Sequence, residues 1–274
     1  MTEKWKLYNN MIVPTGEPHI NIEIEKKTIN ELWKKYPRAI LIRYTSNWDK
    51  QEESEWYYII KDKATELSEL GKSARNQVRK GLKNFEIRKI DLDANYDAIY
   101  EVYVRACERY DSYHVRTKDD YYSFIKSQYI EDVDIWGGFN IESGELMGYS
   151  ICSTYRDSVD WNEATFVPDA LKLRISDAME YFLLDYYINQ KRYRYIISGQ
   201  RSIDHVTNVQ EYDIRQFGFR KAYCDLNIIY RPIVELMVSI LYPFRNSIRK
   251  LGNQNVTLHK LSSIMLLEEI RRKD

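Results

Sequence analysis

Cysteine is scarce in this chain of 274 residues, and it never occurs in a metal-binding pattern. The three cysteines, Cys107, Cys152 and Cys224, lie far apart, and none has a second Cys or a His at the spacing of a metal site. This argues against a disulfide scaffold and against a structural zinc site. We therefore expect no metal and no tightly bound cofactor.

Long hydrophobic runs are also missing. No stretch approaches the ~18 apolar residues that a membrane-spanning helix needs, and Met1 to Lys6 opens no signal sequence, so we expect a cytoplasmic protein. The most apolar segment, Pro232 to Arg245, is too short to span, and the cations Arg249 and Lys250 follow it. It predicts either peripheral contact with the inner face of a membrane through 232–250 or packing on the chain's own core.

Several motifs with a known chemistry do not occur. The chain has neither Gly-x-Gly-x-x-Gly nor a Walker sequence, which argues against dinucleotide and P-loop chemistry. No Ser stands in Gly-x-Ser-x-Gly, so a hydrolase triad has little support. Lys plus Arg and Asp plus Glu number 41 each, so any attraction to nucleic acid or to an anionic membrane must be local.

The order of predicted elements is the most informative feature that is present. Periodicity predicts strands at 39–44 and 56–60, a helix within 64–84, and then a longer alternation of strands and helices. That alternation comprises strand 86–90, helices 95–110 and 118–129, strands 133–139, 146–155 and 158–167, helix 172–190, strand 193–198, helix 207–217 and paired strands 219–224 and 227–230, before a closing helix at 260–272. This order predicts an α/β (α+β) fold with a mixed, largely antiparallel sheet flanked by helices, and a smaller α/β unit in front.

One predicted helix carries an uncompensated basic stripe. Its cations recur at spacings of three and four and therefore share a face, and no acid lies between Glu69 and Glu86 to neutralise them. The stripe consists of Lys72, Arg75, Arg79 and Lys83, with Lys80 beside it. It is either a solvated face or an anion-binding surface for the phosphates of a carrier, in which Arg75, Arg79 and Lys83 would take part.

Residues 85–232 resemble a GNAT-superfamily acyltransferase domain. Leu146-Met147-Gly148-Tyr149-Ser150 is similar to the third strand of that family, and Gln216-Phe217-Gly218-Phe219-Arg220 is similar to the turn that ends its last helix. The basic helix from Lys72 to Lys80, placed before such a domain, resembles the Fem-type branch, which carries a degenerate GNAT-like unit in front. The resemblance implies a partial unit at 1–84, the acyltransferase domain at 85–232 and a helical extension at 233–274.

The resemblance implies transfer of an acyl group, with acetyl expected, from acyl-CoA to an amine on a sugar or cell-envelope precursor. It also implies a cleft where two central strands splay apart. In the family, the donor binds at the turn after the fourth strand, which here has no glycine. The donor-binding candidates are Val167, Lys172, Arg174, Ser176 and Asn208. Because the glycine is missing, an aminoacyl-tRNA donor, as used by Fem-type members, is the alternative, and tRNA is then a partner.

The catalytic candidates are Glu163 on the fourth strand, which could deprotonate an amine, and His205, which titrates near neutral pH. For each, an ordinary structural role is the alternative. The substrate-binding candidates are Arg105, Tyr110, Gly199, Arg201 and Ser202, and the expected acceptor is a small molecule or a lipid-linked sugar. The position of the family's general-acid Tyr is occupied by Ile214, and Tyr212 points roughly 200° away on the helix. A catalytically inactive binding or scaffold protein is therefore the remaining alternative.

Overall fold

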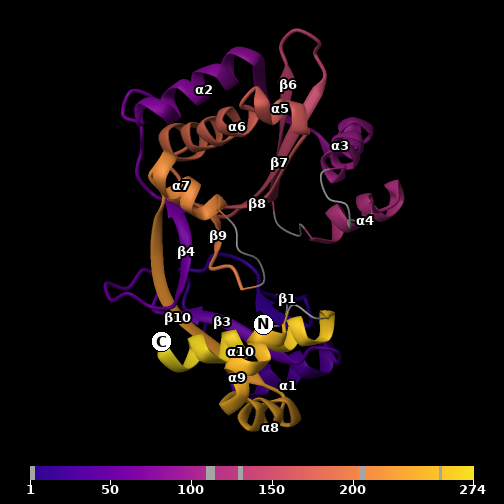
Figure 1. The fold of residues 1–274 in the computed structure, drawn as a ribbon, viewed down its shortest axis with the longest axis vertical. Helices are drawn as coiled ribbons and strands as arrows, with labels where there is room; N and C mark the ends of the chain where they lie inside the picture. The colour runs from indigo at the N-terminus through magenta and orange to yellow at the C-terminus, as the bar shows by residue number, and fades with distance from the viewer. Residues whose placement is uncertain (1–3, 109–114, 129–131, 204–207, 253–254) are drawn as a thin grey trace. The chain divides into compact units, whose positions relative to one another are not determined.

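The computed structural model describes all residues except 1–3, 109–114, 129–131, 204–207 and 253–254 (Figure 1). It divides into two compact units, each assembled from separate segments of the chain. The first unit comprises Met1–Tyr58, Gln200–Asn208 and Lys221–Asp274, and the second comprises Ile59–Gly199 and Val209–Arg220.

Within the described residues of 72–217, the second unit holds five strands and seven helices. Only the last residue of β9, Gln200, belongs to the first unit. Its strands are β5 (Phe85–Ile90), β6 (Asp132–Asn140), β7 (Leu146–Thr154), β8 (Ser158–Phe166) and β9 (Tyr195–Gln200). Its helices are α2 (Lys72–Asn84), α3 (Leu92–Cys107), α4 (Lys118–Gln128), α5 (Pro168–Lys172), α6 (Ile175–Leu184), the π-helix η2 (Asp185–Gln190) and α7 (Val209–Phe217). The strand order is β9-β8-β7-β6-β5, and every neighbouring pair is antiparallel except β8 with β9.

Helices cover both faces of this sheet (Figure 1). On one face, α6 packs so closely on Gly138 and Gly148 that a Cβ on either glycine would lie 2.9–3.0 Å from Ile175. On the other face, α3 packs on β7 and β8, and Tyr121 of α4 meets Tyr149 of β7. Because consecutive strand residues point to opposite faces, Gly148 and Tyr149 define these two sides.

The first unit has its own sheet and its own helices. Its elements are β1 (Trp5–Tyr8), β2 (Met11–Pro14), α1 (Lys26–Lys35), β3 (Leu41–Ser46), α8 (Pro232–Leu241), the 3₁₀ helix η3 (Tyr242–Phe244), α9 (Arg245–Leu251) and α10 (Val256–Lys273). Strand β10 (Arg220–Tyr230) pairs antiparallel with β3, and strand β4 (Trp56–Lys61) crosses from the first unit into the second. The hairpin of β1 and β2 turns through Asn9 and Asn10, both at positive φ, as a tight two-residue turn requires.

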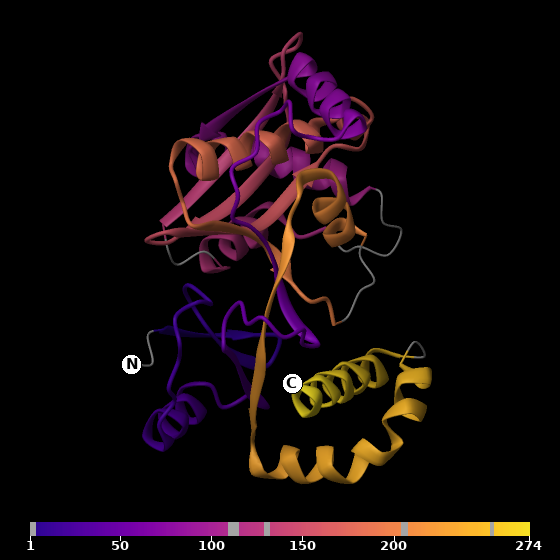
Figure 2. The ribbon, with the colours of Figure 1, turned by 90° about the vertical axis from the view of Figure 1, so that its left-hand side faces the viewer.

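Two apolar clusters stabilise the first unit. Figure 2 shows its N-terminal helix and its C-terminal helices on opposite sides of its strands. Leu41 of β3 belongs to the cluster that packs under Val238 of α8 and Met265 of α10. The next residue, Ile42, belongs to the cluster that contains Leu32 of α1. The alternation of strand residues therefore places α1 on one face and the C-terminal helices on the other.

The predicted fold class is confirmed: the sheet is mixed, mostly antiparallel and flanked by helices. Two details differ. The expected pair of strands at 219–224 and 227–230 is one continuous strand, β10, whose polar residues Asp225 and Asn227 bond to residues on β3 and just after it. Lys50 and Asn47 both donate to the Asp225 carboxylate, and Asn227 donates to Ser46 Oγ at 2.8 Å. The expected helix at 172–190 begins at Ile175 and ends in the π-helix η2.

The proposed boundaries at 84/85 and 232/233 remain predictions about domains. The compact units divide the chain elsewhere, since α2 belongs to the second unit. It packs on α6 through Ala74, Val78 and Gly81, which are its buried residues.

Candidate functional site

A β-bulge in β8 sets the direction of Glu163. Opposite β7, Cys152 pairs with Trp161 and Ile151 pairs with Glu163, so Asn162 is an extra residue. Ile151 and Cys152 are consecutive and point to opposite faces of the sheet, so their partners Glu163 and Trp161 also point to opposite faces. In a regular strand, two residues separated by two positions would point to the same face. The indole of Trp161 donates to Ser150 Oγ at 3.2 Å on the α6 face. The bulge thereby directs Glu163 to the face of α3 and α4.

Glu163 lies where β8 and β9 have separated. The two parallel strands pair only over three residues in the described structure, from Ser158 with Tyr195 to Asp160 with Ile197. β8 continues to Phe166 and β9 continues to Gln200. This is the splayed pair of central strands that the sequence resemblance predicts, and Glu163 lies on its open part.

Three hydroxyl groups lie within hydrogen-bond distance of one oxygen of the Glu163 carboxylate. The Oε1 atom is 2.9 Å from the hydroxyl of Tyr149, 3.0 Å from that of Thr165 and 3.1 Å from that of Tyr121. The phenols of Tyr121 and Tyr149 are also within hydrogen-bond distance of each other, and because each carries a single proton, one of the two donates either to Glu163 or to the other phenol. These hydroxyl groups hold the half-buried side chain of Glu163 in one orientation.

Aromatic packing fixes the two phenols. The ring of Tyr121 stacks on Tyr103 of α3 at 3.9 Å, with an interplanar angle of 10°. Tyr149 is completely buried, and this burial, together with the nearby charge of Glu163, raises the pKa of Tyr149 well above its usual value. Tyr149 is therefore a neutral hydrogen-bond donor over the physiological range of pH.

A second group of carboxylates lies on the α6 face of the same sheet. It consists of Asp177 and Glu180 on α6 and Asp213 on α7, all buried. Ser198, on the open part of β9, donates to Asp213, and Tyr212 donates to Asp177. We call these three acids the buried acid cluster.

Burial sets the protonation of this cluster. It raises the pKa of Asp213 to about 6, although the hydrogen bond from Ser198 acts in the opposite direction. Burial, followed by the charges of Asp213 and Asp177, raises the pKa of Glu180 well above its usual value. Glu180 Oε1 is buried and has no hydrogen-bond partner among the described residues. The cluster therefore retains protons that exposed acids would lose.

The segment expected to bind a donor pyrophosphate lies against α2. A Cβ on Gly81 would fall 2.2 Å from the carbonyl oxygen of Arg174, so the two helices touch here. Lys80 donates to the carbonyl oxygen of Lys172 at 3.0 Å. The first turn of α6 also carries the buried carboxylate of Asp177, which accepts a hydrogen bond from Tyr212.

The donor-binding candidates occupy different positions around this segment. Val167 is buried and precedes α5, and Lys172 is exposed and pairs with Asp169 at 2.8 Å. Arg174 has a positive φ of 71°, and Ser176 is half-buried beside Asp177. Asn208 is exposed immediately before α7. Their roles in donor binding remain predictions.

The chain passes from the second unit to the first near the end of β9. Gly199, in β9, is the last residue of the segment Ile59–Gly199 of the second unit and has a φ of +135°, a conformation that residues with side chains rarely adopt. Arg201 belongs to the first unit, where it forms an ion pair with Glu55, and its N–H donates to the carbonyl of Tyr57 at 2.9 Å. Ser202 is half-buried, and His205 lies outside the described residues. A substrate role for these residues remains a prediction.

Two further candidates lie near α3. Arg105 pairs with Glu145 in the turn between β6 and β7 and approaches Glu101 at 3.9 Å. Tyr110 is outside the described residues. Arg105 therefore already has acidic partners within the chain, and its role in substrate binding remains a prediction.

The basic stripe of α2 forms as a helix face. Arg79 and Lys83 are exposed, while Arg75 is half-buried and donates to the carbonyl of Ser68 at 2.8 Å. The apolar side of α2 packs on α6. The stripe is thus available to solvent, and its binding of an anion remains a prediction.

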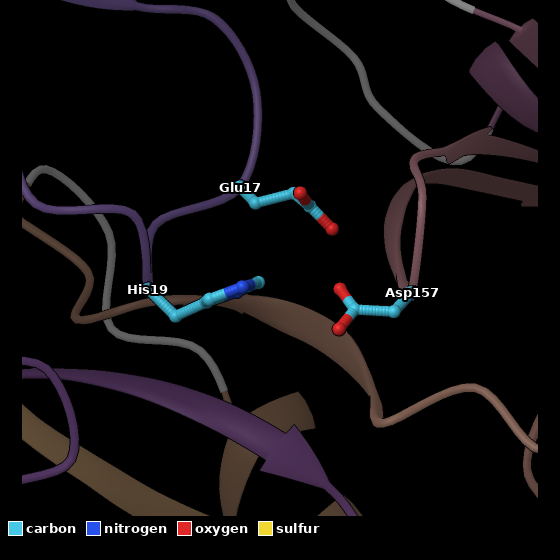
Figure 3. A group of neighbouring side chains, drawn as sticks. All are labelled: Glu17, His19 and Asp157. Atoms are coloured by element: carbon cyan, nitrogen blue, oxygen red, sulfur yellow. The ribbon is translucent and has the colours of Figure 1, made fainter.

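Glu17 and His19 project from the same loop after β2 (Figure 3). Asp157, the third side chain drawn there, belongs to the second unit. The three residues therefore do not form a site within one unit, and we assign no metal to them.

Sequence reasoning missed the residues that surround Glu163. Thr165 lies two positions after Glu163, so both point to the same face of the strand. Tyr149 is the cross-strand partner of Thr165. These signals were available once β7 and β8 were paired. Tyr121 comes from a helix 28 positions before Tyr149, and no local pattern indicates that contact.

Comparisons with known proteins agree on the fold. FemX aligns over 77% of this chain and 77% of its own, with a TM-score of 0.56 and 10% sequence identity. The C-terminal domain (DUF2156) described as part of a lysylphosphatidylglycerol synthetase from Agrobacterium fabrum aligns over 86% of this chain and 84% of its own, with a TM-score of 0.52 and 9% identity. A tandem GNAT protein from the clavulanic acid biosynthesis pathway covers 81% of this chain at a TM-score of 0.40 and 9% identity.

No family model matches the sequence. No curated protein matches it either. The structural neighbours nevertheless bear out the resemblance at the level of the fold: the chain has a GNAT-like, Fem-type fold. Among the residues that the structure describes, no helix is both long and apolar enough to cross a membrane.

Proposed function

We propose that this chain is an acyltransferase that moves an aminoacyl or other acyl group from an activated donor to an amine. The observation that carries the proposal is the position of Glu163, which a bulge turns onto the open part of β8 and three hydroxyls hold in place. A fixed carboxylate at a splayed strand pair is suited to accept a proton from an attacking amine.

In the proposed reaction, the amine nitrogen bonds to the carbonyl carbon of the donor, and the bond from that carbon to the leaving group breaks. Glu163 accepts the proton that the amine loses, directly or through a water molecule. The leaving group departs as a thiol of coenzyme A or as a ribose hydroxyl of tRNA, with a proton from solvent. Tyr121, Tyr149 and Thr165 position the carboxylate.

We propose aminoacyl-tRNA as the donor that the geometry supports better, ahead of acyl-CoA. The segment before α6 has no glycine, the first turn of α6 carries a buried acid, Asp177, and α2 lies against the carbonyl of Arg174, so this segment is poorly suited to hold a pyrophosphate. The fold shared with FemX, at a TM-score of 0.56, supports the same choice, because the resemblance to the Fem-type branch implies an aminoacyl-tRNA donor.

The acceptor that we propose is an amine on a sugar or on a cell-envelope precursor. We further propose that the exposed cations of the basic stripe, Arg79 and Lys83, meet the phosphates of the tRNA. The catalytic participation of His205, which the sequence suggests as a second base, is part of the same proposal.

The test is a transfer assay with labelled aminoacyl-tRNAs and labelled acyl-CoAs, offered with a panel of amino sugars and envelope precursors. Label should pass from aminoacyl-tRNA to an amine acceptor. Transfer only from acyl-CoA would overturn the choice of donor, and no transfer from either, while a reference acyltransferase is active, would overturn the proposal in favour of a binding or scaffold protein.

RNA binding gives an independent measurement of the donor. Affinity for tRNA should fall steeply with salt, and Arg79→Gln with Lys83→Gln should reduce the slope of log affinity against log salt by about one for each lost contact. Lys27→Gln removes an exposed cation from α1 in the first unit and is the matched control. An unchanged slope in the double variant would show that Arg79 and Lys83 do not contact the phosphates of the tRNA.

A further inference from the structure

Helix α8 exposes an apolar face in the first unit. Five large side chains on α8 and η3 are between 53% and 76% exposed: Ile233, Leu236, Met237, Ile240 and Phe244. Single exposed apolar residues are common on soluble proteins, but a contiguous row of this size indicates a surface that binds something.

The row is a second apolar face of a helix that already has one. At 100° per residue, Ile233, Leu236, Met237 and Ile240 fall within an arc of roughly 100°. Val234, Val238 and Leu241 lie on the adjoining arc and pack on the core of the first unit. The core therefore covers one apolar face of α8 and leaves the other in solvent.

Cations flank this face at both ends. After it, α9 carries Lys250, which is exposed, and Arg249, whose side chain is 43% exposed beside Glu269. Before it, Arg231 donates to the carbonyls of Trp33 and Tyr36 at 3.1 Å, which places the end of α1 beside the start of α8. The last turn of α1 carries the exposed Lys34 and Lys35.

The acid of α8 lies on the other side of the helix from the row. At 100° per residue, Glu235 is roughly 150° from the centre of the arc that holds the four apolar side chains of α8. The whole chain is neutral, with 41 residues of each sign, so the cations at the two ends of the row are a local feature.

We propose that the exposed face of α8 docks into the interfacial region of a bilayer rich in anionic phospholipid. An apolar row between two basic ends matches acyl chains below and negative headgroups around them. A second copy of the chain fits less well, because a two-fold contact of this face with itself would bring basic ends together in either orientation. This inference does not depend on the proposed transfer reaction.

The test uses the whole chain and sedimentation with vesicles of phosphatidylglycerol and phosphatidylcholine, compared with phosphatidylcholine alone. The chain should sediment with the anionic vesicles, and Leu236→Ser with Ile240→Ser should lower the partition coefficient by at least about tenfold. Ile141→Ser removes a similarly exposed apolar side chain from the turn after β6 and should change nothing. Ile233→Ser with Met237→Gln is the second pair, for use if the first pair disturbs folding.

Charge is tested separately. Lys250→Gln and Lys34→Gln should each weaken binding by about fivefold at low salt, and added salt should reduce the difference. The proposal is overturned if the chain does not bind the anionic vesicles, or if both apolar pairs bind like the unaltered chain. It is also overturned if the chain forms a dimer without vesicles that the same substitutions dissociate, since the face is then an interface between copies.

Discussion

Glu163 and the buried acid cluster lie on opposite faces of one sheet and differ in what surrounds them. Glu163 faces α3 and α4 and has three hydroxyl groups around one of its oxygens, whereas the cluster on the α6 face places three buried acids near one another. Hydroxyl donors fix the orientation of a carboxylate, while burial and neighbouring acids raise the pKa values of Asp213 and Glu180. The same type of side chain is thus oriented by donors on one face and kept protonated by its surroundings on the other.

The largest effect that separates the two groups is on catalysis. Glu163→Gln keeps an oxygen for the three hydroxyls but cannot accept a proton, so kcat for amine transfer should fall by about 10² to 10⁴. The free energy of unfolding should change by less than about 1 kcal/mol. Steady-state kinetics and urea unfolding measure the two quantities.

The matched change on the other face is Glu180→Gln. Because it removes a buried acid from among two others, it should leave kcat within a few-fold and maintain or increase stability at neutral pH. Glu86→Gln, an exposed position on β5, is the control for loss of a carboxylate. If Glu180→Gln stopped transfer and Glu163→Gln did not, the roles assigned to the two faces would be reversed.

The next effect concerns the packing that borders the acid cluster. In Gly81→Ala the new Cβ would lie 2.2 Å from the Arg174 carbonyl oxygen and 2.8 Å from Ala178 Cβ, so α2 must move away from α6. We expect a loss of about 1–3 kcal/mol in the free energy of unfolding, despite the better helix propensity of Ala. Gly71→Ala, at the N-cap of α2 with no atom within 4 Å, should cost no more than about 0.5–1 kcal/mol, because Gly is preferred over Ala at an N-cap but no packing is disturbed. Equal effects at the two glycines would argue against tight packing at Gly81.

The contrast between the two faces also shows how far the sequence can lead. Alternating and helical periods predict the strands and helices of the second unit, and Glu163 is a candidate from its position on the fourth strand alone. Its direction depends on the extra residue Asn162, and a shift of one residue would turn Glu163 to the α6 face. Helical spacing puts Asp177 and Glu180 on one side of α6, but it does not indicate that this side is buried against Asp213.

The first unit was harder to anticipate for a related reason. The short strands β1 and β2 carry few residues each, so their pattern is weak. In β10, Asp225 and Asn227 look like turn residues, and only the pairing with β3 shows that their side chains meet polar partners. Tertiary contacts decided these elements, and local preference did not.

A smaller effect distinguishes the acid cluster by its pH dependence. The pKa of Asp213 is about 6 in the folded chain, above the value of ~3.9 in an unfolded one, so the folded state binds the proton more tightly. The contribution of Asp213 to stability is therefore full below about pH 4 and is lost as the pH rises to about 6, by on the order of 1–3 kcal/mol.

Unfolding in urea at about pH 4.5 and about pH 7.5 measures this loss. Asp213→Asn keeps an acceptor for Ser198 and should flatten the dependence, whereas Asp119→Asn, at an exposed site on α4, should not. An unchanged slope in Asp213→Asn would show that the cluster does not hold a proton there.

The smallest effect tests whether the hydroxyls around Glu163 orient it. Thr165→Val keeps the shape of the side chain but removes the donor at 3.0 Å, so the carboxylate gains freedom to rotate. A hydrogen bond to a charged group contributes about 1.5–3 kcal/mol, and two phenol donors remain, so we expect kcat to fall by only about tenfold with KM unchanged. Thr165→Ser restores the hydroxyl and should restore kcat, which a purely structural role would not require. Equal kcat in the Val and Ser variants would mean that Thr165 does not position Glu163, and the donor-rich face would then depend on Tyr121 and Tyr149 alone.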